Sequence, residues 1–543
     1  MKYKYFLLSI ASASAISASA QSAIDAKSLN QQDLKGTARF MSMGGAFGAL
    51  GGDLTTISQN PAGIGVYRSN EIGLTVDLDI QSAKSTALDG SFSSNQTKFL
   101  LNNIGGVLTL RLPSKTVPNL NFGFTYNKTA TFNRRYGGSL GAMQNSMTNW
   151  IAGMTNSEEV TVADVETTQS FNPYNPNDGG YAAPWLSILG YDSFLINPVG
   201  NPDAPKWQGQ FGDGTTGTAN YLVSEQGGID SFNIAFGGNF GNILFWGMDF
   251  DITSLNFTQN YLYGENMEGA YVESDRGIEQ TSSNWQMQNY YNMSGTGFAY
   301  KLGLILKPVQ EFRIGFAFHT PTYYALNQTF GASTSYSYNG QQSMGQDTNG
   351  GIPGYSELRY HSPWHLIVSA AGVIGNSLIV SADYEWTQTS KMAFRDPAYY
   401  YSNWNFTPAA DSYNVVNQDI TNYYKNQNTF RIGAEFRVTP QVSIRAGYSN
   451  VSSPVKAEAE SGQEVIYTAG TRPSYIFEGA TNYYTAGLGY RTGGFYADLA
   501  YVHKHQSAKW NAFDSDPDSS DRAPRADLSF ASNQVVLSIG YKF

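Results

Sequence analysis

The sequence predicts an all-β fold, a transmembrane antiparallel β-barrel of about 14 strands with an N-terminal helical hatch plugging the lumen. Three observations carry this prediction: a short export signal, segments that alternate apolar and polar residues, and a lopsided spacing between those segments. Alternation with period two places an apolar row on one face of a strand and a polar or small row on the other. In a membrane barrel these rows face lipid and lumen.

Residues 1–20 are typical of a secretory signal peptide. Lys2 and Lys4 form a basic start, an apolar stretch begins at Phe6, and an Ala-x-Ala cleavage site ends at Ala20. The apolar stretch is too short for a spanning helix, which needs roughly twenty apolar residues. We therefore expect the signal to be removed, leaving Gln21 as the first residue, and the chain to be exported to the bacterial outer membrane.

The last strand shows the alternation most plainly. Val535, Leu537, Ile539 and Tyr541 fall on one face, and the chain ends on the aromatic Phe543. The last strand of a soluble β-sandwich would alternate in the same way. The pattern recurs through the C-terminal half, however, with a polar face rich in Gly and Ala that fits a crowded lumen better than an open surface. The expected strands are 71–82, 100–112, 119–133, 229–240, 242–258, 290–307, 310–322, 360–373, 376–389, 428–438, 441–450, 481–491, 494–506 and 531–543.

Short turns alternate with long polar stretches, and we expect the short turns to be periplasmic and the long loops extracellular. The expected long loops are 83–99, 134–228, 259–289, 323–359, 390–427, 451–480 and 507–530, all within a barrel domain of 71–543. The largest, 134–228, is too long for an unstructured connection, and 143–154 has helical spacing. These loops bind a ligand, cover the pore or shield the surface.

Composition narrows the possible functions. The chain has no cysteine, which excludes disulfide and thiol chemistry, and its net charge of -10 argues against a nucleic-acid partner. The 37 Tyr and 31 Phe suit aromatic belts at two membrane interfaces. Zinc spacing, a Gly-x-Ser-x-Gly elbow and a phosphate loop are all missing from the sequence. We therefore expect no enzyme, no cofactor and no metal; an outer-membrane lipase or protease is the enzymatic alternative.

The segment 21–70 is the expected hatch. Residues 34–50 are rich in small residues and have a helical apolar pattern that Gly51 would end. A flexible glycine-rich leader would not need Phe40, Met41, Met43 and Phe47, so a small helix packed inside a barrel is the better interpretation. These four side chains either line a ligand path or pack against the barrel wall.

A turn motif follows, Asn60-Pro61-Ala62-Gly63, which by itself is a weak signal. Together with 36–39, 43–46 and Asp53, its order and spacing resemble the N-terminal hatch of the FadL/TodX family of outer-membrane transporters. The resemblance covers about 36–82 and 229–543, and includes the segments 297–308, 378–386 and 445–455. It is poor in 134–228, which is longer than such loops usually are.

The resemblance implies a monomeric barrel, set in outer-membrane lipid and lipopolysaccharide, for passive uptake of small hydrophobic molecules of the fatty acid or aromatic hydrocarbon type. Ligand would be captured between extracellular loops, pass to an apolar lumenal pocket, and leave sideways near the third strand, about 120–132 here. Gly123 and Asn127 are the candidates for that lateral opening, although either fits an ordinary strand. The hatch residues Phe40, Met41, Met43, Phe47, Asp53, Asn60, Pro61, Ala62 and Gly63 are the candidate site.

Charged residues supply a second set of candidates. By parity the strand charges that point into the lumen are Arg313, Arg431, Arg437, Arg445 and Glu435, together with Asp383, Glu385 and Asp498. One arginine could bind a ligand carboxylate bidentately. Alternatively, the charges neutralise one another in ladders that hold the hatch.

Two other functions stay open. Some FadL-like proteins serve protein secretion as shuttles, which would need a large exposed docking surface rather than an apolar pocket behind the hatch. Relatives are also described as haem receptors, and His503 and His505 share one strand face. Parity places both histidines on the outward row at the lip of the barrel, which suits a solvated pair better.

Overall fold

The computed structural model describes residues 21–87, 90–175, 183–274, 276–375, 377–397, 413–514 and 522–543. The predicted signal peptide lies outside these residues. Within the described ranges, none of the helices combines the length and the apolar character that a membrane crossing requires.

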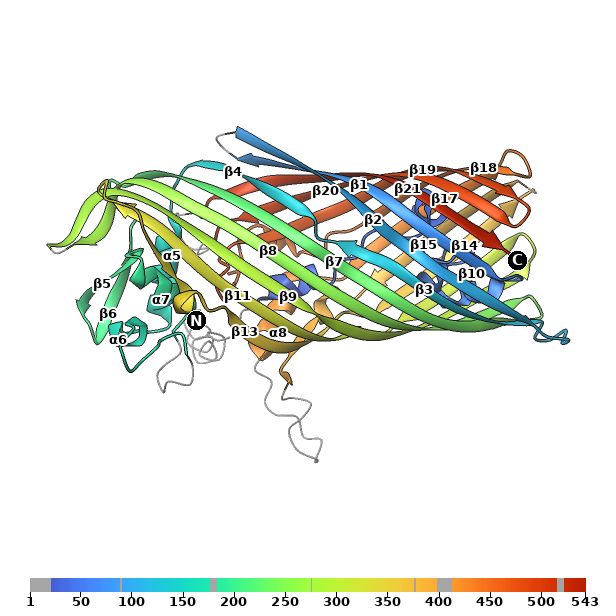
Figure 1. Cartoon of the computed structure of the whole chain (residues 1–543), viewed down its shortest axis with the longest axis horizontal. Helices are drawn as coiled ribbons and strands as arrows, with labels where there is room; N and C mark the ends of the chain where they lie inside the picture. Colours follow the sequence, from blue (N-terminus) through green and yellow to red (C-terminus); the bar gives the residue numbers. More distant parts are fainter. Residues whose placement is uncertain are drawn as a thin grey trace, which may run out of the picture.

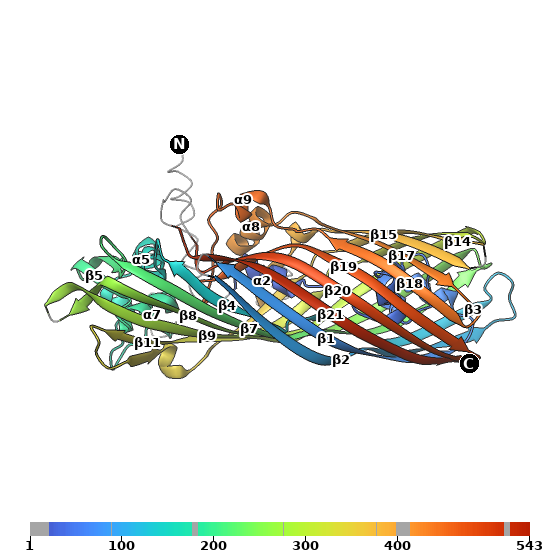
Figure 2. The same ribbon diagram turned by 90° about the horizontal axis from the view of Figure 1, so that it is seen from above.

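The antiparallel strands close into a 14-strand barrel, because the last strand pairs with the first along its length. This confirms the predicted fold class (Figures 1 and 2). Three positions around the wall are each built from two successive strands, so the barrel contains more strand segments than positions. In order around the wall, the strands are β1 (Glu71–Ala87), β2 (Gly90–Arg111), β3 (Asn119–Thr131) continued by β4 (Arg134–Ala142), β7 (Thr216–Phe240), β8 (Leu244–Ser274), β9 (Gly277–Val309), β10 (Phe312–His319) continued by β11 (Tyr323–Tyr338), β13 (Gly354–His361) with β14 (His365–Ile374), β15 (Leu378–Thr387), β17 (Gln427–Arg437), β18 (Val442–Val451), β19 (Tyr475–Thr492), β20 (Phe495–Asn511) and β21 (Arg525–Lys542).

The outer wall is apolar, as the alternation predicts. In β21, Leu537 and Ile539 are 45% and 44% exposed, whereas Gln534 and Ser538 are buried toward the lumen. Aromatic rings lie at both ends of this apolar band. Phe318, Trp364 and Trp386 contact one another in series far from the short turns, and Phe495, Tyr541 and Phe543 lie beside a short turn.

Three of the seven expected extracellular loops are largely strands instead. β8 and β9 pair as one hairpin through 259–289, and β1 and β2 pair through most of 83–99. β11 continues through much of 323–359, where it pairs with β12 (Met344–Asp347) and β13. The apolar outward row that marks a strand in sequence ends where lipid gives way to water, but the backbone still needs hydrogen-bond partners and keeps its ladder.

The segment 134–228 forms a cap over the end of the barrel opposite the C-terminus (Figures 1 and 2). β4 and the start of β7 occupy its two ends. Between them lie α5 (Met147–Ser157), α6 (Val162–Val165), α7 (Trp185–Asp192) and the hairpin of β5 (Ile196–Asn201) and β6 (Ala204–Gly209). The predicted helix at 143–154 is therefore present, displaced toward the C-terminus as α5. Its buried residues pack with those of α7 in one apolar cluster.

Smaller elements complete the extracellular end. They are η2 (Thr348–Gly351), η3 (Thr389–Lys391), β16 (Ala393–Arg395), α8 (Asn414–Tyr423) and α9 (Ala457–Glu460). α8 contributes to a second apolar cluster, which also contains residues of the N-terminal helix α2 (Ala23–Leu29). The chain thus enters the lumen from the capped side, and α2 is held there by aromatic side chains from several strands.

The expected helix at 34–50 is wrong in its extent. Only α3 (Ala38–Ser42) is helical, and the chain then turns at Gly44 and Gly45, whose φ angles are 64° and 76°. Left-handed backbone of this kind favours glycine and ends a helix. Two further short elements follow, α4 (Thr56–Gln59) and the 3₁₀ helix η1 (Pro61–Val66).

Candidate functional site

The turn motif organises the hatch rather than a binding surface. Asn60 accepts from the backbone N–H of Ala62 at 3.1 Å and donates to the carbonyl of Gly48 at 2.5 Å, which joins two parts of the hatch. Asp53 accepts from the Thr37 hydroxyl at 2.8 Å and from the Thr55 N–H at 3.0 Å. Pro61 and Ala62 lie directly against the wall, and Gly63 is buried.

Inward-facing glycines let the hatch backbone lie on the wall. A Cβ at any of six wall glycines would overlap hatch atoms, mostly backbone. Gly433 and Gly447 face Met43, and Gly315 faces Gly48. The others are Gly247 and Gly303, which face 60–62, and Gly487, which faces Ser42. The glycine-rich polar face can be recognised in the sequence, but its contact with the hatch backbone can be recognised only in the structure.

The four large hatch side chains are buried. Phe40 and Phe47 pack ring to ring at 5.6 Å, and Met43 is pressed against the wall glycines. The sulfur of Met41 accepts from the Asn102 amide at 3.2 Å. Of the four, only Phe40 lines the lumenal space described below.

The charged residues form ladders that hold the hatch. Glu435 accepts from Arg39 of α3 at 2.8 Å and from Arg445 at 2.6 Å, and Arg445 also binds Asp498 at 2.6 Å. Arg313 donates to the carbonyl of Leu50 at 2.6 Å.

The two remaining arginine candidates differ in their surroundings. Arg431 binds Glu385 at 2.6 Å, and the second oxygen of Glu385 meets His365 at 2.8 Å. Arg437 lies exposed at the end of β17, outside the lumenal ladders.

Two further contacts hold the hatch. Asp383, which parity places in the lumen, accepts from the N–H groups of Phe47 and Gly48 at 3.0 Å each. Lys35 binds Asp77 at 2.6 Å and Gln534 at 2.8 Å, and the sequence carries no signal for this contact.

A partly open lumenal chamber of about 210 Å³ lies between α2, the hatch and the barrel wall. Most of its lining residues are polar, although Phe40, Ile229 and Ile367 add apolar surface. Gln59 and Ser58 contribute from the hatch, and Ser231, Thr253, Thr387 and Thr429 contribute from four strands. The apolar lumenal pocket implied by the resemblance is therefore not what this chamber provides.

The hydrogen-bonded ladder of the wall is interrupted beside the third strand. Pairing of β2 with β3 ends at Asn103 and Asn127, and the register of β3 against β7 shifts between Lys128 and Ala130. Within the described residues β4 pairs with β7 alone, so β2 and β4 are in contact at Phe92 and Gly138 without a backbone ladder between them; we call this unpaired seam the slot. A small cavity of about 40 Å³ lies at the slot and is lined by Ser94 and Gln96 on one side and by Thr131, Asn133 and the two residues after it on the other.

The two lateral-opening candidates therefore lie in different places. Gly123 pairs with Val107 and faces Ile57 and Ile64 of the hatch, so the wall is closed at its level. Asn127 is the last paired residue before the slot and donates to Asn233 at 2.9 Å.

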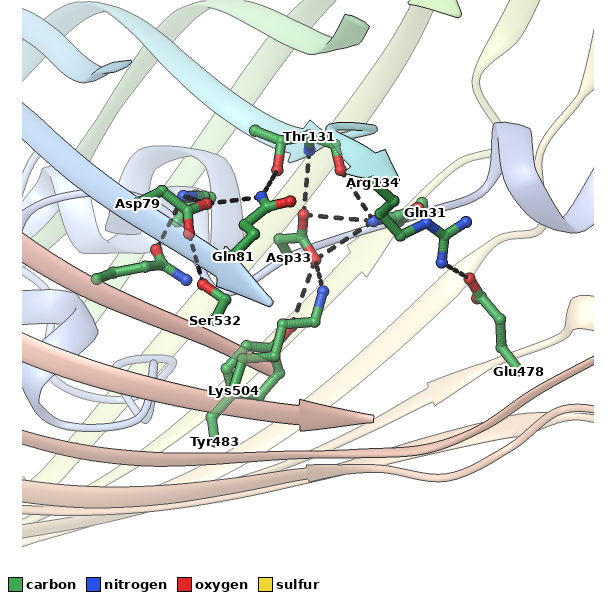
Figure 3. A network of polar contacts seen from close by, with 12 residues as sticks. Gln31, Asp33, Asp79, Gln81, Thr131, Arg134, Glu478, Tyr483, Lys504 and Ser532 are labelled. Atoms are coloured by element: carbon green, nitrogen blue, oxygen red, sulfur yellow. Dashed lines mark hydrogen bonds and ion pairs between the residues drawn. The ribbon is translucent and has the colours of Figure 1, made fainter. Parts of the chain in front are cut away.

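A polar partition separates the chamber from the slot (Figure 3). Asp33 accepts from Lys504 at 2.6 Å and from the N–H of Thr131 at 3.1 Å. The Gln31 amide donates to the Thr131 carbonyl at 3.3 Å and lies beside Asp33. Both residues belong to the segment that joins α2 to α3, and both line the chamber and the slot.

The lipid-facing wall next to the slot is hollowed. A groove of about 900 Å³ crosses β1, β2, β3 and β21, and Ile104 and Phe124, at its edge, each lie close to the point where pairing ends. Its other sides are apolar, with Ile72, Phe122 and Ile539 exposed in it. The slot thus opens beside an apolar surface.

The cap is fastened to the barrel by a buried carboxyl group. Glu265 of β8 accepts from the N–H of Met147 at 2.9 Å, at the start of α5, from the Ser146 hydroxyl at 2.5 Å, and from Tyr263 at 2.8 Å. Burial raises the pKa of Glu265 to about 7, and these hydrogen bonds offset only part of that effect.

We expect the attachment of the cap to weaken as pH rises. The pKa of Glu265 is above its ordinary value of 4.5, so the attached state binds the proton more tightly and loses stability between pH 4.5 and about 7. The total loss of stability of the attached cap approaches about 3 kcal/mol, which follows from the size of the pKa shift of Glu265. Hydrogen exchange of the α5 amides, corrected for intrinsic rates at pH 5 and pH 8, measures it. Glu265→Gln should remove this pH dependence, and an unchanged dependence in the variant would assign it to another group.

His503 and His505 lie outside the chamber. His503 bonds the Asn533 side chain at 2.9 Å, and exposed His505 contacts Ser529 at 3.3 Å. Among the residues that the structure describes, no group of three or more His, Asp or Glu side chains is arranged to hold a metal ion.

A closed barrel, an N-terminal hatch held by ion ladders and a slot in the wall define a plugged outer-membrane channel. The model of the outer membrane protein transport family (OMPP1/FadL/TodX) matches residues 251–543, more than half of the chain, and the protein belongs to this family. No curated protein matches the chain in sequence.

Solved structures share the fold. The Pseudomonas putida toluene transporter TodX is 13% identical with a TM-score of 0.50, covering 94% of this chain and 99% of that one. A deltaS2 mutant of the TodX monoaromatic hydrocarbon channel is 13% identical with a TM-score of 0.51, covering 94% and 100%. A Pseudomonas aeruginosa FadL homologue is 12% identical with a TM-score of 0.49, covering 94% and 99%.

Proposed function

We propose that the protein takes up small hydrophobic molecules across the outer membrane by passive diffusion and releases them sideways into the membrane. The observation that carries this proposal is the slot between β2 and β4, which opens beside an apolar groove on the lipid-facing wall. Membership in a family of outer-membrane transport proteins supports it, as does a fold shared with a toluene transporter.

The route has three stages. A molecule is captured at the cap, enters the chamber between α2 and the hatch, and leaves past Gln31 and Asp33 through the slot. The hatch stays seated throughout, because its ion ladders and glycine contacts close the direct path to the periplasm. No coupling to an energy source is required, since transfer of apolar surface out of water supplies roughly 0.8 kcal/mol per methylene group.

The barrel works as a monomer surrounded by outer-membrane lipid and lipopolysaccharide, and it transports rather than catalyses. The shuttle and haem-receptor alternatives have less support. The family and the compared folds are those of transporters and channels, and His503 and His505 lie on the outward row apart from the chamber.

A disulfide across the slot tests lateral release. A Cβ built on Gly138 of β4 lies 3.7 Å from the Cβ of Phe92 of β2, close to the spacing of a natural disulfide. The chain has no other cysteine. In proteoliposomes loaded with acyl-CoA synthetase to trap decanoate, we expect the oxidised Phe92→Cys/Gly138→Cys variant to take up decanoate about tenfold more slowly, since one tenfold step corresponds to about 1.4 kcal/mol of added barrier.

Reduction with dithiothreitol should restore the rate to that of Gly138→Cys alone, which is the reference because the φ of Gly138, 156°, strains any side chain placed there. Phe92→Cys alone should behave as the unmodified protein does in both conditions. If the oxidised variant transports as fast as the reduced one, the ligand does not leave through this slot. If the unmodified protein is no faster than empty liposomes with decanoate, with toluene and with monodecanoylglycerol, the proposed uptake itself is wrong.

A further inference from the structure

The lining of the chamber is a poor match for a hydrocarbon. Ser231, Thr253 and Thr429 are buried inward-facing residues of three different strands, and all three line the chamber. The Ser231 hydroxyl donates to Asp251 at 2.5 Å and Thr253 bonds Tyr324, but each hydroxyl oxygen can form more than one hydrogen bond. A molecule without polar atoms would return no hydrogen bond to the capacity that remains. The chamber therefore favours a guest that carries hydrogen-bonding groups.

The charges of the chamber are already neutralised. Lys301 lies between Asp251 at 2.7 Å and Asp249 at 3.6 Å. The other lysines and the arginine that line it are also paired: Lys27 with Glu478, Lys35 with Asp77, Lys128 with Asp230, Arg431 with Glu385 and Lys504 with Asp33. A carboxylate would have to break one of these pairs and leave a buried carboxylate of the protein without its partner.

The way out mixes polar and apolar side chains. Gln31, Asp33, Ser94, Gln96 and Asn133 line the slot together with the apolar Ala83 and Phe530. The outer groove, with Ile104, Phe124 and neighbouring side chains, is almost entirely apolar. One molecule meets both conditions if it has a compact polar head and an apolar tail.

Resting on the uptake proposed above, we infer that the transported molecule is an amphiphile with an uncharged, hydrogen-bonding head group, such as the glycerol of a monoacylglycerol. Its hydroxyl groups bond the serines, threonines and amides of the chamber without disturbing an ion pair. A volume of about 210 Å³ holds such a head group but is smaller than the usual pocket for a whole drug-sized ligand. The acyl tail then lies in the outer groove as the head passes the slot.

Three probes of equal chain length separate the possibilities: monodecanoylglycerol, decanoate and decane. The full-length mature protein in lipid nanodiscs is mixed with all three at equal concentration, and native mass spectrometry measures the bound fraction of each. We expect monodecanoylglycerol to occupy the protein at least tenfold more than either other probe. Equal or greater occupancy by decane or decanoate overturns the inference.

A matched variant locates the selectivity in the chamber. Thr253→Val/Thr429→Val removes two hydroxyl groups at nearly constant volume, and Thr216→Val does the same at an exposed position of β7. The double variant should bind monodecanoylglycerol about tenfold more weakly and decane no more weakly, whereas Thr216→Val should change neither. If the double variant does not fold into a heat-modifiable barrel, the single variants Thr253→Val and Thr429→Val replace it. Each single variant should bind monodecanoylglycerol threefold to fivefold more weakly.

The same probes distinguish failure of this inference from failure of uptake. Selective binding of monodecanoylglycerol without entry into proteoliposomes would remove the transport role and keep the head-group preference. Entry of all three probes at equal rates would keep transport and remove the preference. Loss of decane binding in the double variant would show that the threonines only support the chamber, and would overturn the assignment of their hydroxyl groups.

Discussion

Glu435→Ala should loosen the hatch and let large solutes leak across the outer membrane. Glu435 contacts both Arg39 of the hatch and Arg445 of the wall, at 2.8 Å and 2.6 Å. Its removal leaves the largely buried Arg39 side chain without that partner, and breaking a buried pair in this way typically costs about 3–5 kcal/mol. We expect a lower temperature for loss of the compact form on gel electrophoresis and greater sensitivity of cells to vancomycin.

Two further variants give that experiment its controls. Glu311→Ala removes an exposed carboxylate at a short turn and should change neither measurement. Arg39→Met/Glu435→Met removes the charge together with its partner and should recover much of the stability. If Glu435→Ala has the stability and impermeability of Glu311→Ala, the ladder does not hold the hatch.

Gly447→Ala is expected to push the hatch away from the wall. Its new methyl group would overlap the backbone of Met43 and Gly44, and backbone, unlike a flexible side chain, cannot rotate out of the way. Overpacking of this kind costs about 1–3 kcal/mol. Because the cost falls on the contact between hatch and wall, vancomycin entry should rise severalfold while the barrel itself still forms.

Gly372→Ala is the matched control, since the nearest atom to its new methyl group, the Glu311 carbonyl oxygen, is 3.9 Å away. Equal permeability in Gly447→Ala and Gly372→Ala would mean that the hatch can shift without opening a path. Combining Gly447→Ala with Glu435→Ala asks whether the two contacts act together, because both fasten the same turn of the hatch.

The wall could be predicted from sequence because lipid imposes a simple rule on it. Outward residues such as Leu537 must be apolar, so every crossing strand leaves an alternating trace. Beyond the membrane both faces meet polar surroundings, and the trace disappears although β8 and β9 remain paired. The strands predicted from the alternation therefore end where the lipid ends, and the predicted loops include residues that the structure places in strands.

The interior could not be predicted to the same depth. The pattern at 34–50 has helical spacing, but the close wall contacts and left-handed glycines at 44 and 45 turn the chain instead. Asp383 holds Gly48 across a separation of 335 residues, and Lys35 reaches Gln534 across 499. Such contacts depend on how the wall closes around the hatch, which no local pattern records.

The lumenal chamber illustrates a related difficulty. Parity places Arg431 and Arg445 toward the lumen, and neutralising ladders are one of the two roles that the sequence offers for them, but parity cannot say which carboxylate on the next strand each arginine meets. The register between strands decides that, and register comes from the closed barrel as a whole. The polar character of the chamber, and with it the inferred head group, became visible only once the pairs were seen.

The length of the β8–β9 hairpin has a consequence for where a solute first meets the protein. β8 has 31 residues and β9 has 33. At about 3.3 Å per residue and a tilt near 45°, such strands rise roughly 70 Å, whereas the apolar band of an outer-membrane barrel is only about 25 Å tall. The cap therefore projects tens of ångströms beyond the apolar band, so a molecule that arrives from the capped side meets protein well before it reaches the level of the lipid.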